Sequence, residues 1–384
     1  MIQNRHRPIY EKLCYAIMGW FTREAFILLV YMAVSASVLN IFMQTRSLKE
    51  TSAEFSISKM MDGSAYLPYV YRQLVPIIAN YAVKLIHPEE QTEFVEDNLN
   101  KYHLRQFYFG KSKEVLDYNY IIQDNWSPDY AIKYHIVYII VFLSLLGTLY
   151  CLRGLIPAIL ISNNPLTPFL PIIFVLLIPL SFMHGNFFYD FLEFFFLSVL
   201  LLSSIKGCYA WWLLLLPLAV LNKESNIIVP LLYAPVIIAN SLHWRSRIFI
   251  AIGFLISITV FLFIKQKYNM NLGNPFIWQL EPKVIFLLNP ENYFLWSDFY
   301  APMIPFPRGF NIFLLVVLAK LLFWQWKKKP HFAKKLFFIA LIINIPLFIF
   351  LCQTDEIRNL SFLFLPIYLL SVHTLLTTEF QKTT

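Results

Sequence analysis

Charged residues stand at the ends of several long apolar segments, where the chain would leave a lipid bilayer. Asp190 and Glu193 are three residues apart, and this spacing puts both carboxylates on one face of a helix. Glu193 would lie about one helical turn inside the bilayer, where an ionisable group indicates a function by default. His184 lies just before them, in the sequence HGNFFYD over 184–190. Carboxylates in this position could accept a proton or position a cation.

Two further clusters have the same character. Lys223 and Glu224 interrupt an apolar run over 211–238, and Glu356 and Arg358 precede the last apolar segment. Opposite charges so close to a bilayer could bind a charged group at its surface. A plain hairpin turn also needs polar residues at such places, so that alternative stays open.

The first long polar stretch supplies the remaining candidates. Glu54 and Asp62 precede the sequence YRQLVPIIANYAVKLIH over 71–87, which is amphipathic and too short to span a membrane comfortably. We expect it to lie in the interface as a helix, with Arg72 at its start. An anionic lipid headgroup would explain Arg72, and so would plain interfacial snorkelling. Asp62 could equally be a turn residue.

The composition identifies the solvent of this chain. Of its 384 residues, 58% are hydrophobic and 14% are charged, whereas a typical soluble domain carries about 25% charged residues. The mean hydropathy is +0.58. These values exclude a soluble globular enzyme, a disordered protein and a disulfide scaffold. We therefore expect an all-α polytopic membrane protein that forms one integral membrane domain over 1–384.

The distribution of Lys and Arg sets the expected topology. The basic N-terminal tail and the short basic loops belong in the cytoplasm under the positive-inside rule, which also accounts for the net charge of +8 without nucleic acid. This predicts about ten passes, both termini in the cytoplasm of a cell with an inner (plasma) membrane, and two long extracytoplasmic loops, 44–133 and 265–308. The expected passes lie near 25–42, 134–151, 167–183, 189–205, 208–222, 226–241, 248–264, 310–326, 336–352 and 360–377.

On this topology, all the charged clusters fall on the outer side, while the middle of each pass is nearly all Leu, Ile, Phe and Val. The chain thereby resembles the GT-C superfamily of membrane glycosyltransferases, which have many passes, a long first outer loop with interfacial helices, and acidic residues near outer helix ends. The segments that carry the resemblance are Asp62, YRQLVP over 71–76, Tyr189–Asp190, LNKES over 221–225 and EIRN over 356–359.

The resemblance implies transfer of a sugar from a polyprenyl-phosphate donor to a glycan, lipid or protein acceptor during assembly of a cell-envelope polysaccharide or glycolipid. A carboxylate would take the proton of the acceptor hydroxyl, and cations would hold the leaving phosphate. Asp62 is the expected base, with Glu54 or Asp190 as substitutes. The expected substrate-binding residues are Arg72, His184, Glu193, Lys223, Glu224, Glu356 and Arg358.

Two alternatives remain open at this stage. An O-antigen or capsule polymerase would share the same sidedness, and a lipid or polysaccharide translocase would need no chemistry. Polar residues lining a path at mid-depth would favour the translocase. The spacing of the histidines, cysteines and carboxylates implies no metal site, although the chemistry leaves a divalent cation possible.

Overall fold

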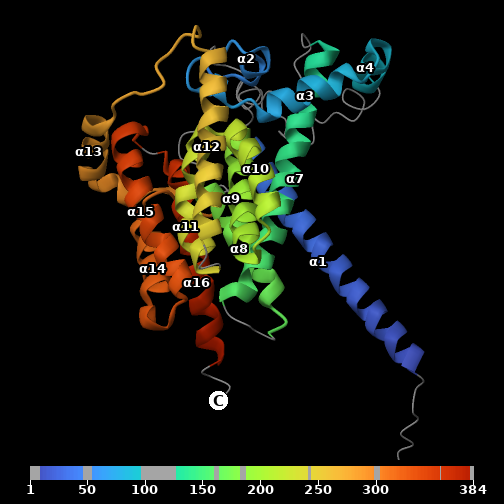
Figure 1. Ribbon diagram of the computed structural model, residues 1–384, viewed down its shortest axis with the longest axis vertical. Helices are drawn as coiled ribbons and strands as arrows, with labels where there is room; N and C mark the ends of the chain where they lie inside the picture. The colour runs from blue at the N-terminus through green and yellow to red at the C-terminus, as the bar shows by residue number, and fades with distance from the viewer. Residues whose placement is uncertain are drawn as a thin grey trace, which may run out of the picture.

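The computed structural model describes residues 9–45, 54–96, 127–159, 164–181, 187–240, 244–297, 303–354 and 356–380. Regular structure in these ranges is helical, except for two short antiparallel strands, β1 (Trp296–Ser297) and β2 (Phe306–Pro307). The apolar helices, long and short, form a bundle, and several short helices of the connecting segments gather at one end of it (Figure 1).

The long helices confirm an all-α membrane protein. They are α1 (Ile9–Thr45), α7 (Pro128–Ile159), α9 (Phe188–Lys206), α12 (Trp244–Lys267), α15 (His331–Leu351) and α16 (Ser361–Phe380). Six segments in the described residues are long and apolar enough to cross a bilayer, and each coincides with one expected pass.

Shorter apolar helices occupy the other four expected passes. They are η3 (Thr167–Phe169) with α8 (Leu170–Leu177) and η4 (Ile178–Ser181), α10 (Tyr209–Asn222), η5 (Glu224–Ile228) with α11 (Val229–Asn240), and α14 (Ile312–Phe323). The 14 residues of α10 rise about 21 Å, less than the roughly 30 Å of a hydrocarbon core. Helix length alone therefore supports six of the ten expected passes.

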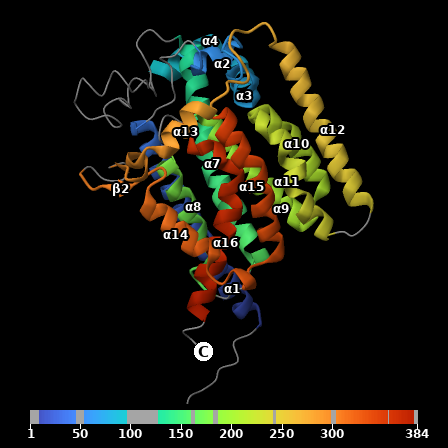
Figure 2. The same cartoon turned by 90° about the vertical axis from the view of Figure 1, so that its left-hand side faces the viewer.

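Helix α9 forms the centre of the bundle. It packs against α7, α10, α11 and α16. In the most apolar 18-residue stretch of α9, 78% is buried, compared with 22% in the corresponding stretch of α12. Beyond Asp190 and Glu193, the sequence of α9 is predominantly apolar on all sides, which is the pattern of an enclosed helix. Gly207 ends it in the left-handed conformation, with φ 69°. By contrast, α12 lies on the outside of α10 and α11 (Figure 2).

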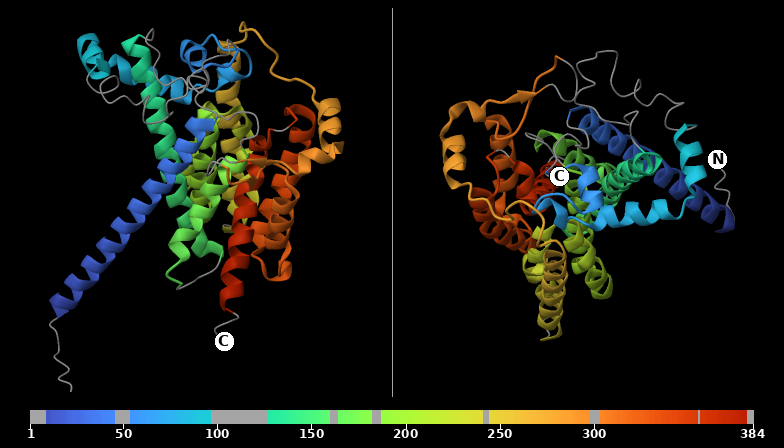
Figure 3. Two further views of the ribbon diagram at one scale, coloured as in Figure 1. Left: turned by 180° about the vertical axis from the view of Figure 1, so that it is seen from behind. Right: turned by 90° about the horizontal axis from the view of Figure 1, so that it is seen from above.

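We call one end of the bundle the loop end, because short helices of the connecting segments gather there. It holds α2 (Ile57–Asp62), η1 (Tyr69–Tyr71), α3 (Leu74–Lys84), α4 (Pro88–Phe94), α13 (Leu280–Leu288) and η6 (Pro290–Tyr293). The C-terminus lies at the opposite end, and the N-terminal part of α1 extends away from the bundle toward that same end (Figure 3).

Helix α3 corresponds to the amphipathic stretch of the first loop. It runs across the ends of the long helices (Figure 1), and its 11 residues are fewer than the expected 71–87. Ile78, Tyr81 and Leu85 of this region are exposed, while Val75 and Ala79 pack into the core. An apolar face left open at the end of a membrane bundle is consistent with a helix lying in the interface.

The sidedness can be tested with single cysteines in a variant whose four native cysteines are replaced. Glu291→Cys lies at the loop end, and Lys328→Cys lies in η7 (Trp326–Lys328), between α14 and α15; both positions are exposed. The positive-inside rule predicts that an impermeant maleimide labels the first in intact cells and labels the second after permeabilisation. Labelling of Lys328→Cys in intact cells would show that the topology is the inverse of the expected one.

Candidate functional site

A cavity of about 430 Å³ lies at the loop end of the bundle. Segments far apart in the sequence form its walls: η1 with its flanking residues, the α10–η5 junction, the last turns of α12, the chain over 274–279, the end of α15 and η8 (Ile357–Leu360). Its volume is within the range of small-molecule sites, about 300–1,000 Å³.

The start of α9 provides two buried carboxylates of the site, Asp190 and Glu193. Asp190 is 1% exposed, and one of its oxygens accepts a hydrogen bond from the backbone N–H of Phe187 at 3.1 Å. This bond caps the helix, where a carboxylate is also stabilised by the helix dipole. The other contacts of Asp190 are with cations, at 3.2 Å to Lys223 Nζ and 2.8 Å to Arg358 Nη1. Capping and charge pairing therefore both explain this residue.

The junction of α10 and η5 sends Lys223 inward. Its backbone is extended, with φ −156° and ψ 128°, so the chain breaks its helical path at this residue. Its Nζ lies 2.6 Å from Glu193 Oε2, 3.2 Å from Asp190 Oδ1 and 3.4 Å from Asn359 Oδ1. Lys223 is buried. An exposed hairpin turn therefore does not explain this cluster.

The segment before α3 supplies Arg72. Its guanidinium binds both carboxylate oxygens of Glu224, at 3.0 and 3.2 Å, and also contacts the hydroxyl of Tyr189. It lies over the ring of Tyr189, 4.1 Å from the centroid, and near the ring of Tyr69 at 5.1 Å. Burial opposes the charged form, but Glu224 outweighs it and raises the pKa of Arg72 above its usual value. Arg72 therefore stays charged.

The last ion pair joins Arg358 of η8 to Glu356, the residue just before this helix. Arg358 Nη2 lies 2.5 Å from Glu356 Oε1, and Glu356 Oε2 accepts hydrogen bonds from the side chain of Asn359 and the backbone of Gln353. Burial raises the pKa of Glu356, but the Arg358 guanidinium has the larger combined effect and holds the pKa below its usual range. Glu356 is therefore ionised at neutral pH.

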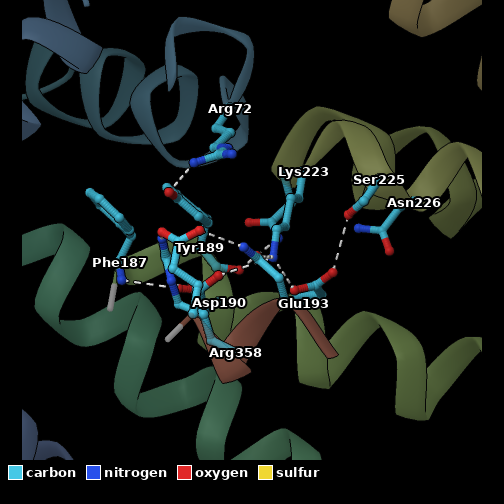
Figure 4. A network of polar contacts seen from close by, with 12 residues as sticks. Arg72, Phe187, Tyr189, Asp190, Glu193, Lys223, Ser225, Asn226 and Arg358 are labelled. Carbon is cyan, nitrogen blue, oxygen red and sulfur yellow. Dashed lines mark hydrogen bonds and ion pairs between the residues drawn. The ribbon is translucent and has the colours of Figure 1, made fainter. Parts of the chain in front are cut away.

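These pairs form two adjoining salt-bridge groups that share the ring of Tyr189 (Figure 4). Three cations face four carboxylates, so the cluster has a formal net charge of −1. Its members are Arg72, Asp190, Glu193, Lys223, Glu224, Glu356 and Arg358, and we call them the charged cluster. All seven are among the residues predicted from the sequence.

The other three predicted residues are not part of the charged cluster. Asp62 is the last residue of α2, is exposed and does not line the cavity. Glu54 is exposed and does not line it either. His184 lies outside the described residues. The structure therefore gives no support to Asp62 or Glu54 as the base.

Several residues that complete the site were given no role from the sequence alone. Tyr189 stacks on Phe187, with ring centroids 5.0 Å apart, and lies under Arg72. Asn359 links Lys223 to Glu356, and Lys265 of α12 lines the cavity. Tyr189 and Asn359 are direct neighbours of predicted residues, and this adjacency was the available signal. Lys265 gave no signal, since it follows an apolar pass as any terminal lysine does.

A strap over 271–279 crosses the loop end between α12 and α13 (Figure 1). At one side, Leu67 N donates to Leu272 O at 2.8 Å, and Asn271 Nδ2 donates to Gly63 O and Ala65 O. At the other side, Gln279 N donates to Phe350 O at 2.8 Å. Residues 274–277 and 279 line the cavity. The strap is thus a wall of the cavity that is held at both sides.

Lys283 of α13 fixes the far side of the strap. It is fully buried, and its Nζ donates to the backbone oxygens of Gln353 and Thr354 at 2.5 and 2.8 Å. The Nζ also lies 3.6 Å from the ring centroid of Phe348. These bonds hold the turn that leads into Glu356, so α13 positions one carboxylate of the cavity.

Gly273 allows the strap to approach Leu67 closely enough for the hydrogen bond between Leu67 N and Leu272 O. Its φ is +101°, and a Cβ there would lie 2.8 Å from Leu67 O. We expect Gly273→Ala to weaken the strap by about 1–3 kcal/mol, the usual cost of a strained backbone. Hydrogen exchange should then become faster at the Leu67 amide, whereas Leu272→Ala, at an exposed neighbour, should leave it unchanged. Equal exchange in both variants would contradict the anchoring role.

Within the described ranges, no group of three or more His, Cys, Asp or Glu residues is arranged to hold a metal ion. Comparison of the chain with models of protein families, with curated proteins and with solved structures gives no match.

Proposed function

We propose that this chain is a membrane glycosyltransferase that moves a sugar from a polyprenyl-phosphate donor to an extracytoplasmic acceptor in cell-envelope glycan or glycolipid assembly. The observation that carries the proposal is the cavity itself: it lies at the ends of membrane helices and has both an apolar and a charged wall. In this proposal the chain crosses the plasma membrane about ten times and keeps both termini in the cytoplasm.

The two walls match the two parts of such a donor. Apolar side chains from η5, α12, α15 and α16 line the cavity, and they are Ile227, Ile228, Phe261, Leu347, Leu351 and Phe362. A prenyl chain gains free energy by contact with such a surface. Glu224 and Glu356 supply a charged part of the same lining. Sugar hydroxyls need hydrogen-bond partners of this kind.

Glu224 is the carboxylate best placed to act as general base. Its side chain is 24% exposed, compared with 13% for Glu356 and 1% for Asp190. Within the described part of the chain, its carboxylate accepts hydrogen bonds from one other residue, Arg72. A carboxylate has about four acceptor positions, so Glu224 can also accept the hydroxyl proton of an acceptor.

The proposed reaction balances without a further reactant. The acceptor oxygen attacks the anomeric carbon as its proton passes to Glu224, and the bond from that carbon to the phosphate oxygen breaks. The bonding electrons leave with the phosphate, whose negative charge grows and needs a cation nearby. Arg72 holds the Glu224 carboxylate in place by a two-point contact, which fixes its direction as well as its charge.

Four buried hydroxyl groups within the helices favour an enzyme over a translocase. Ser144, Thr148, Ser204 and Ser257 donate to carbonyl oxygens three or four residues earlier in their own helices. Hydroxyl groups satisfied in this way do not form a polar path through the bundle.

The test is a transfer assay in proteoliposomes, with labelled polyprenyl-phosphate sugars as donors and membranes of the source cell as acceptor. The proposal predicts labelled product and an equal amount of released polyprenyl phosphate. A ladder of repeating oligosaccharide units would identify a polymerase instead. Movement of intact donor between leaflets, with no release of phosphate, would identify a translocase.

A further inference from the structure

The three cations of the charged cluster are already occupied. Arg72 uses Nε and both Nη atoms on Glu224 and Tyr189, and Lys223 Nζ has three oxygen partners. Both Nη atoms of Arg358 bind carboxylates. Since the cluster as a whole is negative, an incoming phosphate would have to displace a carboxylate from a buried cation. Such a displacement leaves a charge unpaired and is costly.

Lys265 offers the cavity a cation without this cost. It lines the cavity from the last turn of α12 and is exposed. In the ranges that the structure describes, no carboxylate lies within ion-pair distance of it. Phe261 also lines the cavity one helical turn earlier, so both side chains share one face of α12.

We infer that Lys265, and not the buried cations, binds the phosphate of the lipid donor. The face of α12 then follows the ligand along its length, with Phe261 against the prenyl chain and Lys265 against the headgroup. The buried cations instead hold Glu224 and Glu356 in position. This assignment rests on the proposed function, since it supposes that a prenyl phosphate enters the cavity.

The neighbouring residue Lys267 provides a matched control. It lies two positions further along the same helix end, is also exposed, and does not line the cavity. Its Nζ lies 5.0 Å from the ring centroid of Tyr268. Any general effect of removing a positive charge from this end of α12 should therefore appear equally in Lys265→Met and Lys267→Met.

The experiment measures binding of labelled geranylgeranyl phosphate to the protein in nanodiscs of zwitterionic lipid. Lys265→Met should weaken binding about tenfold or more, the range for losing a charged hydrogen bond. Lys267→Met should bind as the wild type does, and Lys265→Arg should retain most of the affinity. Geranylgeraniol should compete equally in all variants, and inorganic phosphate should compete poorly.

The two possible failures are distinguishable. If the wild type binds the prenyl phosphate and Lys265→Met binds it equally well, the assignment of Lys265 is wrong and the proposed function stands. If inorganic phosphate competes as strongly as the prenyl phosphate, the site is a free-anion site and the lipid assignment is wrong. If the wild type shows no saturable binding, the proposed function fails together with the assignment.

Discussion

Glu224→Gln should reduce sugar transfer by about 10²–10⁴-fold, the usual effect of removing a general base. The amide keeps the size of the side chain and one acceptor for Arg72, but it cannot take up the hydroxyl proton. The loss should appear in turnover, while binding of the lipid donor should change little, since the proposal assigns the donor phosphate to Lys265 and not to this residue. Initial rates of labelled product in proteoliposomes, normalised to folded protein, measure the effect.

Asp62→Asn is the informative comparison for this variant. Sequence reasoning favours Asp62 as the base, whereas the structure places it at the exposed end of α2, away from the cavity lining. We expect Asp62→Asn to transfer sugar at the wild-type rate, as should Glu281→Gln on the exposed face of α13. Normal turnover in Glu224→Gln with loss in Asp62→Asn would restore the sequence-based assignment and contradict ours.

Asp190→Asn should lower the free energy of unfolding by about 3–5 kcal/mol, the cost of breaking a buried ion pair from one side. The variant leaves both Lys223 and Arg358 without this carboxylate, at a position where all three side chains are buried. Asn can still accept from the backbone of Phe187, so the helix cap is largely retained. Reversible unfolding in mixed micelles measures the change.

Asp129→Asn provides the control for stability. Asp129 forms a pair with Lys133 at 2.6 Å on the first turn of α7, and its side chain is 47% exposed. Pairs of this kind contribute about 0.3–0.5 kcal/mol. If the two variants lose the same small amount of stability, the charged cluster does not hold the loop end together, and its carboxylates are free for other roles.

The fold could be predicted from the sequence to a large extent, because apolar run length is a direct consequence of bilayer thickness. All six long helices coincide with expected passes. The remaining four passes are harder to assign, since Pro217 in α10 and Pro235 in α11 lie within short apolar helices. A proline interrupts helical hydrogen bonding, so its effect on helix length depends on how the neighbouring helices pack.

The charged cluster could be predicted for a related reason. Ionisable residues such as Glu193 and Lys223 are so costly beside hydrocarbon that their presence alone indicates partners. Their pairing could not be predicted, because it depends on the crossing of α9, η5 and η8 at the loop end. Asp62 lies outside the cavity lining for the same reason: closeness to Arg72 along the chain does not determine closeness in space.

Photo-crosslinking can show whether the cavity binds a lipid-linked donor. The probe is a polyprenyl-phosphate sugar with a diazirine in its second isoprene unit, and modified peptides are located by mass spectrometry. We expect modification of Phe261, Phe276 and Leu347, which line the cavity, and suppression of this modification by unlabelled donor. Modification confined to outward-facing residues such as Leu255 and Ile342, unaffected by competitor, would contradict it.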